Sequence, residues 1–489
     1  MIKFGQLLPD QPDLNNAGVT VATNVVPAVS GYNSLRGINA YSNAADAKIT
    51  GMFSAKDDDG TIDVYCGDST KLYELNSSTN ALSNISKSGN YNSTTQRWRF
   101  CQFGEDVIAV NFNNETQYKT AAASLFADLS ADAPRAKFVA VVRDFVMTGY
   151  TYDSTDGNKP YRVRWSGLGD HTSWAISATT QADYQDIADM GAVTGLVGGE
   201  YATILLEKGI VRASYIGSPL IFQFDKVETN RGCAYSGSVC NVGHTVFYLA
   251  DDGFYMFDGN GSKPIGAERI NEFFFEDFNK QFASEMHSAV DPLRQIVVWS
   301  YPSKAATNGL CDKILIYNYA VDKWSVAEVG VDCIAPIFSP SYSLEDLDTA
   351  FGTDLDALPA SLDSSLYRGG EFFFAGTRDN KIQTFTGSVL PATIETGEFE
   401  LKAGKVSLVR NIMPYVNSHG AVPATITAQV ASRLRQNDQS SFGSVSSLNT
   451  DNYIPVRANG RYHKIRFNIS GDWTQAQGFD IEATVIGKR

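Results

Sequence analysis

Short apolar runs separated by turn residues recur along the chain. In residues 246–259, two such runs flank Asp252-Gly253, and Asp258-Gly259 follows the second run. Glycine after aspartate is typical of a tight hairpin turn, because glycine adopts positive φ at little steric cost. A single hairpin cannot bury its apolar face, whereas a row of hairpins can. The repetition predicts an all-β fold, with related hairpins at residues 64–73, 204–211 and 372–385.

The spacing of the strand-like segments predicts a β-propeller of six or seven blades between residues 49 and 390. Most intervals between successive segments are close to the ~40–50 residues that one blade requires. Aromatic residues make up 12% of the chain, which suits strands that pack on a pleated surface. The segments begin near Ile49, Trp98, Phe138, Val193, Val239, Ser288 and Phe372.

Three stretches do not follow this spacing. Residues 1–48 have no clear period but contain several valines, and we expect an extended N-terminal arm pinned to the body. An insertion near 270–286 carries phenylalanines spaced for one face of a short helix. A second insertion, near 341–368, is acidic, and we expect a loop or a short helical excursion. The phenylalanines of the first insertion are Phe274, Phe275, Phe278 and Phe282.

Residues 391–489 form a separate C-terminal antiparallel β domain in this interpretation. In 462–469, His463, Ile465, Phe467 and Ile469 alternate with polar residues, so one face of a strand is apolar. The domain carries 11 Lys and Arg against 8 Asp and Glu, whereas the remainder carries 29 against 46. We expect its cationic face to be a platform for attachment to an acidic partner. The candidate assembly surface is Arg457, Arg461, Lys464 and Arg466.

If these side chains point into solvent, reversing Arg461 and Arg466 to glutamate weakens assembly and leaves folding intact.

The bulk composition also limits the kinds of partner that the chain can bind. The chain of 489 residues has a net charge of -14, which argues against affinity for nucleic acid, since such affinity requires cations that displace counterions. No apolar stretch reaches the length of a signal peptide or a membrane span, so we expect no membrane insertion. The six cysteines form no CxxC pair and are expected to be reduced.

Motifs for catalysis, metals or cofactors are not evident. The five histidines have no paired spacing, and neither a P-loop nor a Gly-x-Ser-x-Gly elbow occurs. Residues 57–60 and 153–157 resemble calcium loops but lack the following bidentate acid, so we interpret them as solvated turns. Residues 161–174 combine arginines with aromatic residues and are interpreted as strand-edge packing rather than a sugar or base site. We therefore assign no catalytic, cofactor-binding or metal residues.

Ordered features along the chain resemble the tail hub, or nozzle, proteins of short-tailed bacteriophages. That family includes packaged-DNA stabilisation proteins and tail tubular protein B. Each similar segment is weak alone, and their common order carries the resemblance. The segments are Leu8-Pro9-Asp10, Asn24-Val25-Val26-Pro27, Gly31-Tyr32, residues 164–174, residues 247–259, residues 355–359 with 361–363 and 369–370, residues 460–478 and Gly487-Lys488-Arg489.

The resemblance implies a structural protein of the virion tail, assembled in the host cytoplasm, with no catalysis and no cofactor. It implies a homohexamer that forms a ring below the portal adaptor and contacts a needle, tip or fibre protein below. Packaged double-stranded DNA would be retained by this ring and would pass through it without specific binding.

Two other functions stay open at this stage. A propeller enzyme or lectin could act on host surface glycan, because propeller glycosidases place pairs of carboxylates at the central channel. A cellular interaction propeller is disfavoured, because the Gly-His and Trp-Asp signature of WD repeats is missing.

Overall fold

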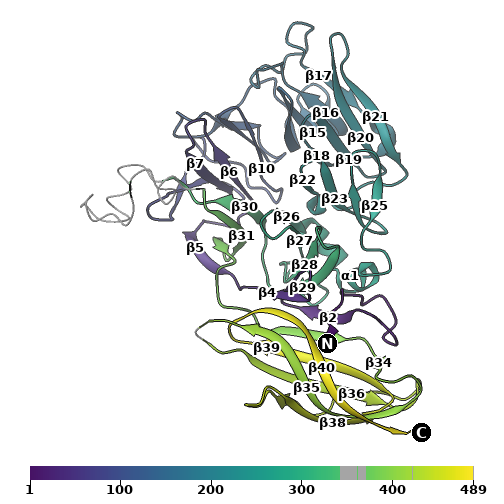
Figure 1. The fold of residues 1–489 in the computed structure, drawn as a ribbon. Coiled ribbons are helices and arrows are strands. Elements are labelled where there is room, and N and C mark those ends of the chain that lie inside the picture. Colours follow the sequence, from purple (N-terminus) through teal and green to yellow (C-terminus); the bar gives the residue numbers. More distant parts are fainter. Residues whose placement is uncertain (342–360, 362–369, 421, 488–489) are drawn as a thin grey trace.

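The computed structural model describes residues 1–341, 361, 370–420 and 422–487. Figure 1 shows a propeller in the upper part of the view, a β-sandwich in the lower part, and N-terminal strands between them. The predicted all-β propeller with a C-terminal antiparallel β module is confirmed. The structure settles the number of blades in the described part of the chain at seven.

Blades 1 to 4 are four-stranded antiparallel sheets that follow one another in the sequence. In each of them the first strand lies innermost. Their strands are, in blade 1, β6 (Gly51–Lys56), β7 (Ile62–Gly67), β8 (Leu72–Leu75) and β9 (Leu82–Asn84); in blade 2, β10 (Arg99–Phe103), β11 (Asp106–Val110), β12 (Gln117–Lys119) and β13 (Ala127–Asp128); in blade 3, β14 (Arg135–Val142), β15 (Phe145–Asp153), β16 (Gly157–Trp165) and β17 (Asp183–Asp186); and in blade 4, β18 (Val193–Val197), β19 (Tyr201–Leu206), β20 (Gly209–Gly217) and β21 (Ile221–Thr229).

Blades 5 to 7 complete the ring, and the last of them takes its outermost strand from the N-terminal segment. Their strands are, in blade 5, β22 (Cys240–Val242), β23 (Thr245–Ala250), β24 (Gly253–Phe257) and β25 (Ser262–Pro264); in blade 6, β26 (His287–Asp291), β27 (Ile296–Tyr301), β28 (Lys313–Asn318) and β29 (Lys323–Ala327); and in blade 7, β30 (Ile334–Phe338), β31 (Phe372–Arg378), β32 (Lys381–Thr384) and β5 (Asn39–Ala44).

Six of the predicted segment starts lie within a few residues of the observed innermost strands, whereas the seventh, at Phe372, is the start of a second strand. Blade 7 begins at Ile334, because Phe372 opens its second strand, β31. The short strand β30 is separated from β31 by the acidic insertion, so no hairpin pattern marked it. The hairpin predicted at 246–259 is present: Ala250 pairs with Gly253, whose φ of 150° is in the region that favours glycine.

Apolar clusters join each blade to the next. Phe247 of blade 5, for example, belongs to the same buried cluster as Trp299 of blade 6, and the other six adjoining pairs have clusters of their own. Strand β5 then closes the ring, since Ala40 pairs with Gln383 of β32. Burial of apolar surface between all neighbouring blades makes the propeller one rigid unit.

The C-terminal domain is a sandwich of two sheets that also incorporates the start of the chain. The first sheet contains β2 (Val19–Thr23), β33 (Ala392–Thr396), β39 (Tyr462–Ser470), β36 (Thr425–Arg433) and β37 (Ser446–Ser447), with β34 (Phe399–Glu400) at β39. The second contains β3 (Val25–Pro27), β4 (Tyr32–Ser34), β40 (Trp473–Gly487), β35 (Val406–Ser418) and β38 (Ile454–Gly460), with β1 (Ile2–Lys3) at β40.

The N-terminal segment therefore joins the two parts instead of lying on them as a separate arm. Strand β2 pairs in parallel with β29 of blade 6, through Thr23 and Val326, and with β33 of the sandwich on its other side. One buried cluster accordingly contains Phe4, Trp324 and Phe467, from the N-terminal segment, the propeller and the sandwich. The two parts share a core and do not meet merely at a surface.

The insertion near 270–286 forms helix α1 (Asn271–Asp277) and the 3-10 helix η3 (Lys280–Glu285). Phe274 and Phe278 are buried in the shared core, as their spacing predicted, while Phe282 packs against Gly309. Two further 3-10 turns are η1 (Ala188–Met190) and η2 (Ser236–Ser238). Apart from residues 341 and 361, the insertion predicted near 341–368 lies outside the described residues.

Candidate functional site

The predicted assembly surface is largely neutralised by carboxylates of the same chain. Strand β39 alternates as predicted, with Ile465, Phe467 and Ile469 buried and Lys464 and Arg466 on the other face. These two cations, together with Arg461, contact carboxylates that come from other strands or loops. In the part of the chain that the structure describes, Arg457 on β38 is exposed and has no ion-pair partner.

Glu395 of β33 is the centre of this charge pairing. Its Oε1 lies 2.7 Å from Lys464 Nζ, and its Oε2 lies 2.6 Å from Arg466 Nε. The side chain of Glu395 is only 6% exposed. Lys464 Nζ is also 3.0 Å from Asp13 Oδ2, and Arg461 Nε is 2.8 Å from Glu400 Oε1. Three of the four predicted residues are therefore already paired within the described chain, and Arg457 is the one available to an acidic partner.

The sequence did not reveal these carboxylate partners. The position of Glu395 opposite Arg466, 71 residues further along the chain, depends on the pairing of β33 with β39. Register between distant strands is set by the buried faces of both strands and cannot be derived from one segment.

The mouth of the propeller channel is crossed by Arg97, which precedes the innermost strand of blade 2. Arg97 Nη2 donates to the carbonyl oxygen of Glu285 at 2.5 Å, and Nη1 donates to that of Asp332 at 3.3 Å. Glu285 precedes blade 6 and Asp332 precedes blade 7. Blades 2 and 6 lie on opposite sides of a seven-bladed ring. The side chain of Arg97 therefore reaches across the channel opening at this end.

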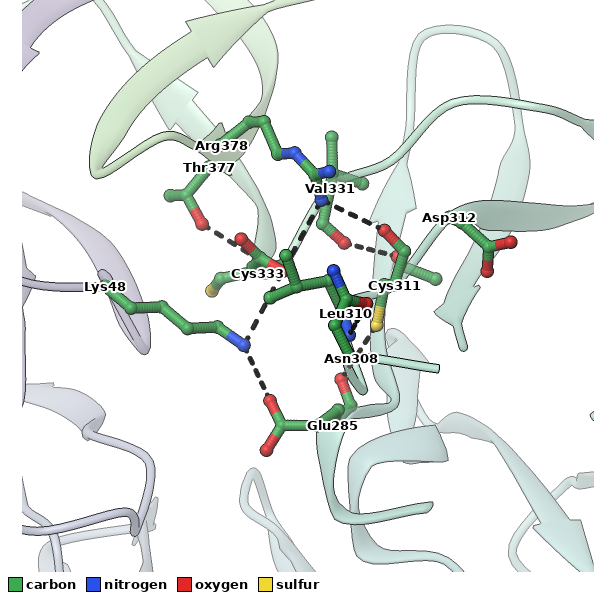
Figure 2. A network of polar contacts seen from close by, with 12 residues as sticks. Lys48, Glu285, Asn308, Leu310, Cys311, Asp312, Val331, Cys333, Thr377 and Arg378 are labelled. Atoms are coloured by element: carbon green, nitrogen blue, oxygen red, sulfur yellow. Dashed lines mark hydrogen bonds and ion pairs between the residues drawn. The ribbon is translucent and has the colours of Figure 1, made fainter. Parts of the chain in front are cut away.

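Further polar contacts surround this crossing. Lys48 Nζ lies 2.7 Å from Glu285 Oε2 and 3.5 Å from Asp332 Oδ1, and Arg378 Nη1 lies 3.9 Å from the same Asp332 oxygen. Figure 2 shows Lys48 pointing toward Glu285 from the left of the view, while Arg378 enters from above. We call Lys48, Arg97, Glu285, Asp332 and Arg378 the channel-mouth network. It ties together segments that precede blades 1, 2, 6 and 7.

A cavity of about 240 Å³ lies on the propeller axis, since the innermost strands of blades 1 to 6 line it. Its lining includes Arg99, Asn241 and His287 but no aspartate or glutamate. Nδ1 of His287 accepts a hydrogen bond from the backbone N–H of Ile334 at 3.3 Å. The pKa of His287 lies well below its usual value, because the ring loses hydration and lies near Arg97 and Arg99. The imidazole is therefore neutral, with its proton on Nε2.

A wider groove of about 900 Å³ runs between blade 6 and the sandwich. Val29 and Leu293 line it and are 84% and 73% exposed. Arg36 and Arg294 also line the groove, whereas Asp472 is its one carboxylate among the lining residues that the structure describes. Apolar side chains exposed to this degree are suited to burial by another protein surface.

The remaining sequence candidates are structural. Arg162 is buried and pairs with Asp186 through Nε at 2.6 Å, and its guanidinium group stacks on Tyr184 at 3.8 Å. Arg164 donates to the carbonyl oxygen of Trp174 at 2.9 Å. The arginine and aromatic segment 161–174 thus packs within blade 3 and, through Trp174, against blade 2. Asp153, in one of the calcium-like loops, accepts backbone hydrogen bonds within its own turn.

The described residues contain neither a thiol with a lowered pKa nor a group of metal ligands. The six cysteines are free, and burial raises the pKa of Cys101 and Cys240 to about 12 and that of Cys311 to about 11, so these thiols stay protonated. Within residues 1–341, 361, 370–420 and 422–487, no three histidine, cysteine, aspartate or glutamate side chains are grouped to hold a metal ion. The same part of the chain contains no helix with the length and apolarity of a membrane span.

Comparison with known proteins adds little to this description. No protein-family model matches the sequence, and no curated protein matches it. Among solved structures, the chain is similar to the WD40 domain of Pan2 from Neurospora crassa, at 9% identity and a TM-score of 0.38, over 63% of this chain and 90% of that one. The propeller assignment rests on the strand pairing described above.

Proposed function

We propose that this chain is a structural subunit of a short-tailed phage tail. Six copies form a ring below the portal adaptor, retain packaged DNA and conduct it during ejection. The resemblance of ordered sequence segments to tail hub proteins supplies this assignment. The structural observation that best supports the proposed function is the core shared by the propeller and the sandwich. A shared core makes the subunit stiff, and one sector of a load-bearing ring must be stiff.

The path of DNA in this proposal runs between the copies and not along the axis of any one propeller. Arg97 spans one end of the propeller channel, and the cavity behind it holds only about 240 Å³. DNA therefore passes through the centre of the ring. The net charge of -14 favours sliding over adhesion, because an acidic wall repels phosphates.

Two surfaces are available for contacts in the ring. The groove between blade 6 and the sandwich carries exposed Val29 and Leu293, which a neighbouring copy would cover. Arg457 offers an unpaired cation to an acidic partner, which under this proposal is the adaptor above or the needle below. Heterologous contacts of this kind close into a ring when the rotation between copies is correct.

The alternative function, an enzyme or lectin that acts on host glycan, has less support. Glycoside hydrolysis uses two carboxyl groups that flank the scissile bond. The described lining of the channel cavity contains none, and that of the groove contains Asp472 alone. The two carboxylates at the channel mouth, Glu285 and Asp332, both lie within ion-pair distance of Lys48. The arginine and aromatic segment 161–174, a candidate for sugar binding, is engaged in packing.

Electron microscopy of the purified chain, alone and with its tail adaptor, tests the proposal. We expect annular particles of six copies with a central opening, and no release of reducing ends from host polysaccharide in a parallel assay. Single particles with no annular form in the presence of the adaptor would contradict the ring. Reducing-end release that disappears when a carboxylate is changed would establish the enzyme instead.

A further inference from the structure

The cavity on the propeller axis contains a cation without a counter-ion. Arg99 lines the cavity, and in the described part of the chain no carboxylate lies within ion-pair distance of it. Its Nη1 donates to the carbonyl oxygen of Lys137 at 3.1 Å, and its guanidinium group stacks on Phe138 at 4.4 Å. One of its five N–H donors is thus used by the protein.

A half-buried charge without an ion-pair partner is unfavourable, because its partial loss of hydration is offset by only one hydrogen bond, to Lys137. This cost is visible in the pKa of Arg99, which loss of hydration and the nearby Arg97 lower to about 10. Proteins usually compensate such a group with a carboxylate, as Glu395 does for Arg466 here. Around Arg99 the compensating group is missing, and the cavity occupies the place where it would lie.

The other polar groups that face the cavity favour an anion as well. His287 is neutral, with its Nε2 3.7 Å from Cys333 Sγ. Ser236 adds a hydroxyl group to the lining, and Asn241 adds an amide group that also donates to the carbonyl oxygen of Gly243. No carboxylate in the lining would repel a negative charge. At about 240 Å³, the cavity has room for a small oxyanion and several waters, since one water takes about 30 Å³ of liquid volume.

We propose that the axial cavity is a binding site for a small oxyanion, phosphate or carboxylate, with the Arg99 guanidinium group as its main ligand. The anion takes the free N–H donors of Arg99, which bind two oxygens side by side. Arg97 closes the mouth of the channel on one side of the anion through its bonds to Glu285 and Asp332. This site concerns the interior of each propeller and is independent of ring assembly.

Isothermal titration calorimetry of the full chain with inorganic phosphate, in chloride buffer at constant ionic strength, tests the site. We expect one phosphate per chain, and at least tenfold weaker binding in Arg99→Gln. Arg99→Lys keeps the charge but loses the fork of donors, so we expect intermediate affinity. Arg457→Gln, which removes an exposed arginine, should bind as the unchanged chain does. A parallel titration with acetate distinguishes a carboxylate site from a phosphate site.

The proposal is overturned if neither anion binds the unchanged chain, or if Arg99→Gln binds as tightly as the unchanged chain. Should Arg99→Gln fail to fold, crystals of the unchanged protein soaked in selenate decide the question. Anomalous density within hydrogen-bond distance of the Arg99 guanidinium group would support the site, and density only elsewhere on the protein would exclude it.

Discussion

Arg97 and Glu285 meet across the mouth of the propeller channel. The guanidinium group of Arg97, before blade 2, donates from Nη2 to the main-chain oxygen of Glu285, before blade 6, at 2.5 Å. Arg97 also donates to the carbonyl oxygens of Ser284 and Asp332. One side chain therefore satisfies three carbonyl groups from two loops on the far side of the ring, and it holds those loops in place.

Replacing Arg97 by alanine should lower the free energy of unfolding by about 2 kcal/mol, because it removes three hydrogen bonds and leaves the carbonyl oxygen of Glu285 with only the Cys311 thiol as donor. Chemical denaturation measures the loss. Arg36→Ala is a matched control, since Arg36 makes one exposed bond, from Nη1 to the carbonyl oxygen of Gly387 at 3.2 Å. We expect a change of about 0.5 kcal/mol or less there. Equal losses in the two variants would show that the crossing of the channel mouth adds no stability.

Phe4 tests whether the N-terminal segment is part of the core. It is 2% exposed and packs against Phe467 and Phe479 of the sandwich, with ring centroids 5.4 and 5.7 Å away. Phe4→Ala should lower the free energy of unfolding by about 3 kcal/mol or more, as removal of a buried phenyl ring does elsewhere, and should lower the thermal midpoint accordingly. Ile2→Ala, at a side chain that is 39% exposed, should change the thermal midpoint far less. A removable arm would give two small and similar effects.

The local part of the fold could be predicted from the sequence. The hairpin at 246–259 and the alternation at 462–469 are determined by neighbouring residues, because turn chemistry and side-chain period act over a few positions. Ile465, Phe467 and Ile469 are accordingly buried as expected.

Contacts between distant segments could not be predicted in the same way. Ala40 pairs with Gln383, and Thr23 pairs with Val326, although residues 1–48 have no period of their own. The strands with which residues 1–48 pair could therefore not be identified from the sequence of this segment. The same holds for the channel-mouth network, whose five residues come from loops before four blades and from β31, and for Glu395 beside Arg466. Such sites depend on the closed ring and on sheet register.

His463 gives the fold a dependence on pH. It is fully buried, with Nε2 at 2.9 Å from Ser407 Oγ and Nδ1 at 2.8 Å from Ser432 Oγ. Burial lowers its pKa to about 4. Between about pH 6.5 and pH 4 the unfolded chain therefore binds a proton that the folded chain does not, and stability falls as pH falls, by about 3 kcal/mol in total.

His463→Gln should remove that part of the pH dependence. Urea titrations at pH 7 and pH 4.5 measure it as the difference between variant and unchanged chain, so that the similar contribution of His287 cancels. His419→Gln, at an exposed histidine, should retain the full dependence. A pH dependence that persists undiminished in His463→Gln would mean that His463 is protonated in the fold.

Arg466→Glu should impair folding, in contrast to the expectation from sequence that this face is free. The variant removes one partner of Glu395, whose side chain is 6% exposed, and places a second carboxylate beside it. Lys464 remains as a partner and Arg466 is itself 36% exposed, so we expect a loss of about 2 kcal/mol in unfolding free energy. Arg457→Glu, with the same charge change on the same domain, should stay within about 0.5 kcal/mol. Reversed magnitudes in chemical denaturation would refute this account of the pairing.

Arg457→Glu is then the variant that isolates assembly from folding. Arg457 is exposed, and reversing it turns attraction toward an acidic partner into repulsion without disturbing an ion pair in the described chain. Because such rim charges act mainly on the rate of association, we expect slower binding to the tail adaptor and a weaker dependence on salt. Surface plasmon resonance at two ionic strengths measures both. Lys208→Glu makes the same charge change at an exposed turn of blade 4 and should bind as the unchanged chain does. If both variants slow association equally, net charge is responsible, and Arg457 has no specific place in the interface.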